Sequence, residues 1–287
     1  MAALRISPPG TSYLGLLLPY EHPMVSALVS LSFSFLLGVE GQATPLLLGA
    51  AFGLLGGAQN ALNASTDLSA DRISWPERPL ASGRLTARNA KAVSLGLFVA
   101  AESFVALSMI LRPSAMLLLV MLADFSLRIL YSSPPVRLKR FPLLGNLIAS
   151  AFVVLFPLLG SVTIASKGPA ALVGTGVVLF LNSLATFIME DVVTEAGDRA
   201  VGDRTLPVLL GKRWSTRISS LIYAAALSVL LLGLTTSQFI LFLVATLAEA
   251  PLIAIPLFVA EGLSAFRACG LTAAILGAIL VVGQILA

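Results

Sequence analysis

Two short stretches of this chain carry aspartates at spacings that suit helical metal chemistry. The first stretch holds Asn63, Asp67 and Asp71, each four residues from the next. On an α-helix a step of four residues drifts by only about 40°, so these three side chains form one stripe. Pro76 and Pro79 follow and are expected to end the helix and begin an irregular loop.

The second stretch is "EDVVTEAGDRAVGDRTLP", residues 190–207. Asp191 and Asp198 are seven residues apart, which is two helical turns, and therefore lie on one face. Thr194 lies between them and adds a hydroxyl. Glu195 lies on nearly the same face and is a possible substitute ligand.

Carboxylates stacked on one helix face repel each other and require a neutralising partner. Magnesium is suited to this role, because it takes oxygen ligands and typically combines one or two carboxylates with substrate phosphates. We therefore expect metal ions that bridge a diphosphate, whose remaining oxygens nearby cations would bind. The candidate cations are Arg72, Arg78, Arg204, Arg137, Lys139 and Arg140. The alternative is that both stretches are solvated, salt-bridged connections.

The composition indicates which elements position these residues. Of 287 residues, 57% are hydrophobic and only 11% are charged, with a mean hydropathy of +0.97. A soluble domain would carry about 25% charged residues. Nine apolar stretches are long enough to span a bilayer: 14–39, 43–63, 88–110, 113–132, 142–165, 169–191, 215–235, 238–260 and 266–286. We expect an all-α polytopic membrane protein, with residues 1–287 forming one integral-membrane domain.

Composition also excludes several kinds of site. The chain has one cysteine, Cys269, and one histidine, His22, which excludes a disulfide framework and a Cys/His zinc site. A Ser-His-Asp triad would have to use His22, at the edge of the first apolar run, and is disfavoured. That run is interpreted as a first membrane helix and not as a cleaved signal peptide.

The basic residues predict an orientation in the cell membrane. With a cytoplasmic N-terminus, inner loops and their flanks hold 16 of the 18 basic residues, and only Arg112 and Lys167 lie outside. Eight of the 14 acidic residues gather in the two inner stretches described above, although topology requires no carboxylates there. We therefore expect a multi-pass protein with both Asp-rich loops in the cytoplasm.

At these residues the chain resembles the intramembrane UbiA-type prenyltransferases. Asn63, Asp67 and Asp71 match the family's NxxxDxxxD signature, and "PERPLASGRLT" resembles its continuation. The second signature, DxxDxxxD followed by RTLP, is matched by Asp191 and Asp198, with Thr194 in place of the middle aspartate. Tyr131 and Lys139 resemble the family's YxxxK element at a longer spacing.

The resemblance implies nine transmembrane helices around a central cavity that cytosolic loops cap. It implies that two or more Mg2+ ions bridge the diphosphate of geranylgeranyl or another polyprenyl diphosphate. The allylic C–O bond then breaks towards a carbocation, which Phe187 could stabilise. The implied catalytic and metal-binding residues are Asp67, Asp71, Asp191 and Asp198, with Asn63 as a ligand or positioning group. The implied diphosphate-binding residues are Lys139, Arg72, Arg78, Arg140 and Arg204, and Tyr131, Thr194 and Glu195 are secondary candidates.

Two kinds of acceptor remain open. The chain looks most like the archaeal ether-lipid branch, in which a geranylgeranyl group passes to the hydroxyl of geranylgeranylglyceryl phosphate. The alternative is an aromatic acceptor, 4-hydroxybenzoate or a naphthoate, in quinone synthesis. Either way the partners are a prenyl diphosphate, a lipid or aromatic acceptor and membrane lipid, and no nucleic acid is expected.

A transporter is the competing class, and its pathway would use three acids within the apolar runs: Glu102, Asp124 and Glu249. It is disfavoured, because no internal repeat is visible and the densest charge lies at one membrane face. For Asp124 we expect an ion pair with Arg128, four residues further on. No role is assigned to Glu102 or Glu249.

Overall fold

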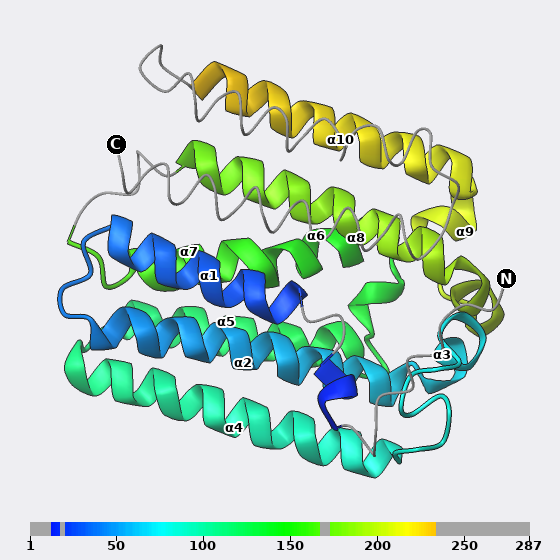
Figure 1. Ribbon diagram of the computed structural model, residues 1–287, viewed down its shortest axis with the longest axis horizontal. Helices are drawn as coiled ribbons and strands as arrows, with labels where there is room; N and C mark the ends of the chain where they lie inside the picture. Colours follow the sequence, from blue (N-terminus) through cyan, green and yellow to red (C-terminus); the bar gives the residue numbers. More distant parts are fainter. Residues whose placement is uncertain (1–12, 18–20, 167–172, 234–287) are drawn as a thin grey trace, which may run out of the picture.

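The computed structural model describes residues 13–17, 21–166 and 173–233, and every regular element in these ranges is helical (Figure 1). In chain order the elements are η1 (Tyr13–Leu17), α1 (Glu21–Leu36), α2 (Ala43–Thr66), α3 (Leu68–Ser74), α4 (Ala87–Leu111), α5 (Ala115–Ser132), η2 (Leu138–Arg140), α6 (Leu144–Ser150), η3 (Ala151–Leu155), α7 (Phe156–Val162), α8 (Val173–Val201), α9 (Leu206–Leu210) and α10 (Lys212–Gly233).

Five helical runs are long and apolar enough to cross a membrane: α2, α4, α5, the combined run Leu144–Val162, and α8. The apolar helix α1 is shorter, at 16 residues. The described part of the chain therefore has the length and composition of a polytopic membrane protein. The predicted helices 238–260 and 266–286 lie outside the described residues, so the predicted count of nine stays a prediction.

One of the predicted helix boundaries is wrong. The described α-helix within the predicted span 14–39 is α1, which begins at Glu21, and Pro23 lies in its first turn, where a missing N–H is tolerated. A helix that ran through this position would lose a hydrogen bond. The apolar span 169–191 is continued by α8 to Val201, which confirms that Asp191 and Asp198 lie on helix.

The predicted helix 142–165 corresponds to one helical run with a wide turn in its middle. Residues Ala151–Leu155 are π-helical between α6 and α7. Pro157 follows directly, at the start of α7. Because proline has no N–H for the carbonyl four residues before it and its ring crowds that carbonyl, a locally wider turn accommodates it.

The long helices lie side by side with their axes nearly parallel (Figure 1). Helix α2 packs against both α1 and α4, and α8 packs against α10 and the short helix α3. Small residues permit the close approach of α1 and α2. A Cβ atom built on Gly56 would lie 2.8 Å from the Cα atom of Pro23, so this contact fixes where α1 begins.

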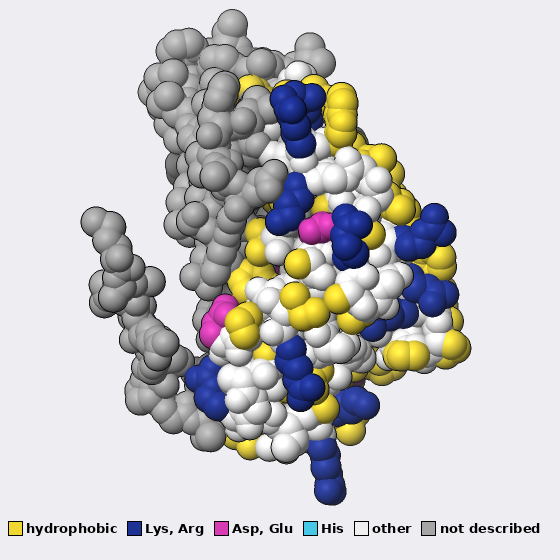
Figure 2. Space-filling model, turned by 90° about the vertical axis from the view of Figure 1, so that its right-hand side faces the viewer, with side chains coloured by type: hydrophobic (Ala, Val, Ile, Leu, Met, Phe, Trp, Pro, Cys, Tyr) yellow, Lys and Arg dark blue, Asp and Glu magenta, His cyan; other side chains and the backbone are white. Residues whose placement is uncertain are grey.

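The two ends of the bundle differ in charge. One end, which holds α3 and α9, presents many Lys and Arg side chains to the solvent (Figure 2). Its exposed basic residues include Arg72, Arg84, Arg88, Lys91, Arg140, Arg199, Arg204 and Arg213. The opposite end has Arg112, which is paired with Glu40. We call the first of these the basic end.

Candidate active site

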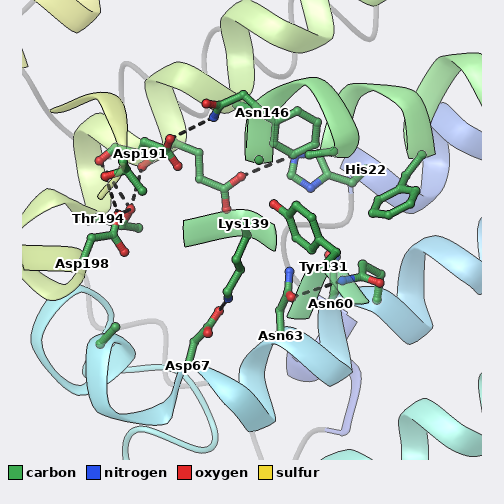
Figure 3. A pocket seen from close by; sticks show the side chains of 18 of the residues that line it. His22, Asn60, Asn63, Asp67, Tyr131, Lys139, Asn146, Asp191, Thr194 and Asp198 are labelled. Atoms are coloured by element: carbon green, nitrogen blue, oxygen red, sulfur yellow. Dashed lines mark hydrogen bonds and ion pairs between the residues drawn. The ribbon is translucent and has the colours of Figure 1, made fainter. Parts of the chain in front are cut away.

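A cavity opens near the basic end between α2, α5, α6 and α8 (Figure 3). Its lining brings together most of the site residues expected from the sequence, although they come from segments far apart in the chain. The expected residues that line it are Asn63, Asp67, Asp71, Arg78, Tyr131, Lys139, Asp191, Thr194 and Asp198.

The first aspartate stretch crosses the junction of α2 and α3. Asp67 is the residue between the two helices, with φ −103° and ψ 9°. The backbone still keeps the helical hydrogen-bond spacing, because Asp67 N–H donates to Asn63 O at 2.8 Å and Asp71 N–H donates to Asp67 O at 2.8 Å. The expected stripe is therefore present, with a local kink, and α3 ends at Ser74 before Pro76.

The second aspartate stretch lies on continuous helix, which α3 contacts directly. The Gly197 N–H donates to Ser74 Oγ at 3.1 Å, and Ser74 Oγ donates to the Thr194 carbonyl at 3.1 Å. A Cβ atom on Gly197 would lie 2.5 Å from the Ala70 carbonyl oxygen. The absence of a side chain at residue 197 thus allows the two stretches to approach each other.

Cations bind the carboxylates of the first stretch. Lys139 forms an ion pair with Asp67, whose other oxygen accepts from Arg137 at 3.1 Å. Arg78 Nη1 lies 3.1 Å from each carboxylate oxygen of Asp71. Burial raises the pKa of Asp71, and the Arg78 guanidinium acts in the opposite direction. The first stretch is therefore largely neutralised by side chains of the protein itself.

Neutral groups bind the carboxylates of the second stretch. Asn146 Nδ2 donates to Asp191 Oδ2 at 2.9 Å. The hydroxyls of Thr194 and Thr205 donate to Asp198 Oδ2 at 3.0 and 3.2 Å. Within the described part of the chain neither aspartate forms an ion pair, and the nearby cation Lys139, which acts on both at longer range, is itself paired with Asp67.

The donor set of the cavity fits magnesium in its chemistry, because it offers carboxylate, amide and hydroxyl oxygens. Among the described residues, no three His, Cys, Asp or Glu side chains are placed to hold an ion by themselves. Magnesium usually keeps several waters and is bound through one or two carboxylates and substrate phosphates.

Five expected residues do not line the cavity. Arg72, Arg140 and Arg204 are exposed, and the Arg140 guanidinium lies over the ring of Phe141, at 5.1 Å from its centroid. Glu195 is paired with Arg199, one turn further along α8. Arg137 is outside the lining but pairs with two carboxylates that belong to it, those of Asp67 and Asp203.

Several lining residues were not expected from the sequence. His22, Gln59, Asn60, Asn146, Glu190, Asp203 and Thr205 all line the cavity. Asn146 had a weak signal, as an amide near the start of an apolar run, and Asp203 lies close to the second stretch. Gln59 Nε2 donates to Ser132 Oγ at 2.7 Å, a contact between α2 and α5 that sequence spacing does not indicate.

The expected ion pair within α5 is confirmed. Arg128 Nε lies 2.8 Å from Asp124 Oδ2, and both side chains are buried. Arg128 also donates to the carbonyls of Leu55 and Phe152 at 3.3 Å each. Of the other two acids in apolar runs, Glu102 has a buried carboxylate oxygen without a hydrogen bond, and Glu249 lies outside the described residues.

Comparison with known proteins identifies relatives in sequence. The model of the UbiA prenyltransferase family matches residues 25–264. The digeranylgeranylglyceryl phosphate synthase of Methanopyrus kandleri is 33% identical over 171 residues, which cover 60% of this chain and 59% of that protein. The synthase of the same name from Methanothrix thermoacetophila is 34% identical over 187 residues, covering 64% and 65%. The chain thus matches about three fifths of the length of these curated relatives.

Solved structures share the fold. A UbiA homolog from Archaeoglobus fulgidus bound to DMAPP and Mg2+ superposes with a TM-score of 0.63 at 17% identity, covering 96% of this chain and 99% of that one. The apo UbiA homolog from Aeropyrum pernix K1 gives a TM-score of 0.68 at 20% identity, covering 91% and 98%. By the family match and the shared fold, this chain belongs to the UbiA prenyltransferase family.

Proposed function

We propose that this chain is a magnesium-dependent prenyltransferase of the cell membrane. It transfers a geranylgeranyl group from its diphosphate to the hydroxyl of geranylgeranylglyceryl phosphate. The observation that carries the proposal is the meeting of two aspartate stretches and Lys139 in one cavity. The similarity to curated synthases and the DMAPP and GPP bound with Mg2+ in the Archaeoglobus homologue support it.

Asp67, Asp71, Asp191 and Asp198, with Asn63, would hold the magnesium ions beside the diphosphate. Bound magnesium neutralises the diphosphate and makes it a better leaving group. Asp191 and Asp198 offer carboxylates that form no ion pair among the described residues, which favours metal binding on that side. The hydroxyl of Thr194 orients Asp198 from the place where the family has an aspartate.

Lys139 and Arg78 neutralise the diphosphate. The Lys139 side chain extends across the cavity towards Asp67, with Asp191 and Asp198 on the other side (Figure 3). When the diphosphate and its metal bind, the ammonium and the guanidinium exchange their carboxylate partners for phosphate oxygens. Both cations are already in place, so little reorganisation is needed as the leaving group gains charge.

The deeper lining holds the start of the prenyl chain. Phe152, Val153, Ala149 and Phe187 present apolar surface below the carboxylates. Tyr131 packs edge-on against Phe152, with ring centroids 5.5 Å apart. These groups exclude water from the allylic cation, and the aromatic faces stabilise its charge.

The basic end faces the cytoplasm in this proposal. It carries nearly all of the described basic residues outside the apolar runs, whereas the other end has Arg112. The positive-inside rule therefore places the cavity mouth and both aspartate stretches on the cytoplasmic side. The spare cations around this mouth also suit an acceptor that carries a phosphate.

The test is a product assay on purified protein with geranylgeranyl diphosphate and magnesium. Geranylgeranylglyceryl phosphate and 4-hydroxybenzoate are offered in parallel, and Asp67→Asn is the control. We expect an ether product that requires magnesium and is absent from the control. A prenylated benzoate alone would move the activity to an aromatic acceptor, and no product from either acceptor would contradict the proposal.

A further inference from the structure

His22, which is the chain's one histidine, lies in the wall of the cavity and not at the membrane surface. Helix α1 begins at Glu21, well inside the bundle and away from the basic end (Figure 1). The first turn of α1 packs closely on α2, because a Cβ atom built on Gly56 would lie 2.8 Å from the Cα atom of Pro23. The position of His22 is thus determined by helix packing, which gives the imidazole a defined place in the cavity.

The imidazole packs between an aromatic ring and a carboxylate of α8. The ring centroids of His22 and Phe187 are 4.6 Å apart, with an interplanar angle of 46°. His22 Nε2 lies 3.9 Å from Glu190 Oε2. Figure 3 shows His22 on the side of the cavity away from Asp67, above Tyr131 in this view. The Glu190 carboxylate is therefore close enough to interact with the ring when the ring is protonated.

The depth of His22 matches that of the reacting carbon. Phe187 precedes Asp191 by four residues of continuous helix, so it lies about 6 Å deeper along α8. In the proposed function the diphosphate lies at the level of Asp191 and Asp198. The allylic carbon attached to it then lies one turn deeper, beside Phe187 and His22.

We infer that His22 is the base that accepts the proton of the acceptor hydroxyl. The inference rests on the proposed function. The allylic C–O bond breaks and its electron pair leaves with the diphosphate. The acceptor oxygen forms the new C–O bond, its proton passes to the imidazole of His22, and Glu190 stabilises the imidazolium. The proton later returns to water, so the ring is regenerated without a further reactant.

The other polar groups of the lining are less suited to this task. Arg78, Arg128 and Lys139 are cations and do not accept protons. Asp67 and Asp71 are paired with Lys139 and Arg78. His22 supplies an imidazole nitrogen, which can accept a proton, at the level of the reacting carbon.

Three variants test this role by single-turnover transfer to geranylgeranylglyceryl phosphate. His22→Gln removes the base, His22→Phe keeps an aromatic ring against Phe187, and His22→Ala leaves room for added imidazole. We expect each variant to transfer at least about 100-fold more slowly, and imidazole to restore at least about tenfold in His22→Ala alone. Magnesium-dependent binding of geranylgeranyl S-thiolodiphosphate should stay within about threefold of the unmodified protein, which shows that the site is folded.

Two results would overturn the inference. Transfer by His22→Phe near the normal rate would show that the ring serves packing only. If added imidazole does not restore transfer in His22→Ala while the variant still binds the analogue, the slow transfer is not caused by the loss of a base. Failure of the proposed function is distinguishable, since the unmodified protein would then form no ether product at all.

Discussion

The two aspartate stretches face the same cavity but are neutralised in different ways. Asp67 and Asp71 are paired with Lys139, Arg137 and Arg78, whereas Asp191 and Asp198 accept only from amide and hydroxyl groups. The first stretch is thus balanced within the protein. The second stretch forms no ion pair among the described residues, and Lys139 acts on it only at longer range.

Under the proposed function this difference gives the two sides separate tasks. On the first side the cations that would bind phosphate are held by the carboxylates, which keeps them positioned before substrate arrives. On the second side carboxylates without an ion pair would raise the affinity for a divalent cation, at the cost of repulsion when no metal is bound. Aspartates would therefore hold cations of the protein in the first stretch and bind metal in the second.

The largest expected contrast is in stability without metal. Asp67→Asn leaves Lys139 without its partner, which should lower the free energy of unfolding by about 2 kcal/mol, because a half-buried cation then lacks its counter-charge. Asp191→Asn removes a carboxylate that repels neighbouring carboxylates, so the free energy of unfolding should stay unchanged or rise. Thermal unfolding in detergent with a chelator measures the stability of both variants. Equal losses of stability in Asp67→Asn and Asp191→Asn would contradict the difference between the two stretches.

The contact between the two stretches is the next to test. Gly197→Ala places a methyl group against the Ala70 carbonyl and should cost about 1–3 kcal/mol, because α3 and α8 must separate. Gly96→Ala is the matched control, since nothing lies within 4 Å of a Cβ atom there and the residue is also helical. The unfolding temperature and the rate of magnesium-dependent transfer should both fall in Gly197→Ala. Both should stay unchanged in Gly96→Ala.

The cavity arginine should matter more than the exposed one. Arg78→Ala removes the guanidinium beside Asp71 and should weaken binding of a prenyl diphosphate analogue about tenfold. Arg72→Ala should change binding by less than about twofold, because this side chain is exposed and does not line the cavity. Comparable losses in a titration of the two variants would show that Arg72 moves into the site on binding.

The smallest expected effect concerns the orientation of Asp198. Thr194→Val keeps the shape of the side chain but removes the hydroxyl that donates to Asp198 Oδ2. Thr205 still donates to the same oxygen, so transfer should slow by only about threefold to tenfold. The magnesium concentration for half-maximal activity should rise in parallel, and an unchanged value would show that Thr194 does not act through the metal site.

The sequence predicted the parts of this molecule that depend on local spacing. Asn63, Asp67 and Asp71 form a stripe because helical hydrogen bonds continue across residue 67, and Pro76 follows the end of α3. Asp124 pairs with Arg128 because both lie on one helix. The apolar runs also predicted most of the described helices.

What spacing could not predict are the contacts between distant segments. Arg72 and Arg78 look alike in sequence, and only the path of the chain after α3 separates the exposed one from the one that lines the cavity. His22 was placed at the edge of an apolar run, whereas the short α1 puts it in the cavity wall. Asn146 contacts Asp191 because of helix packing, which no local pattern encodes.

The most direct test of the central claim is equilibrium binding of geranylgeranyl S-thiolodiphosphate to the purified protein, with magnesium and with a chelator. If both aspartate stretches bind one metal–diphosphate unit, binding should be saturable with magnesium. It should be at least about 100-fold weaker with the chelator, in Asp67→Asn and in Asp191→Asn. Binding that is unaffected by the chelator, or that persists when either aspartate is replaced, would contradict the account.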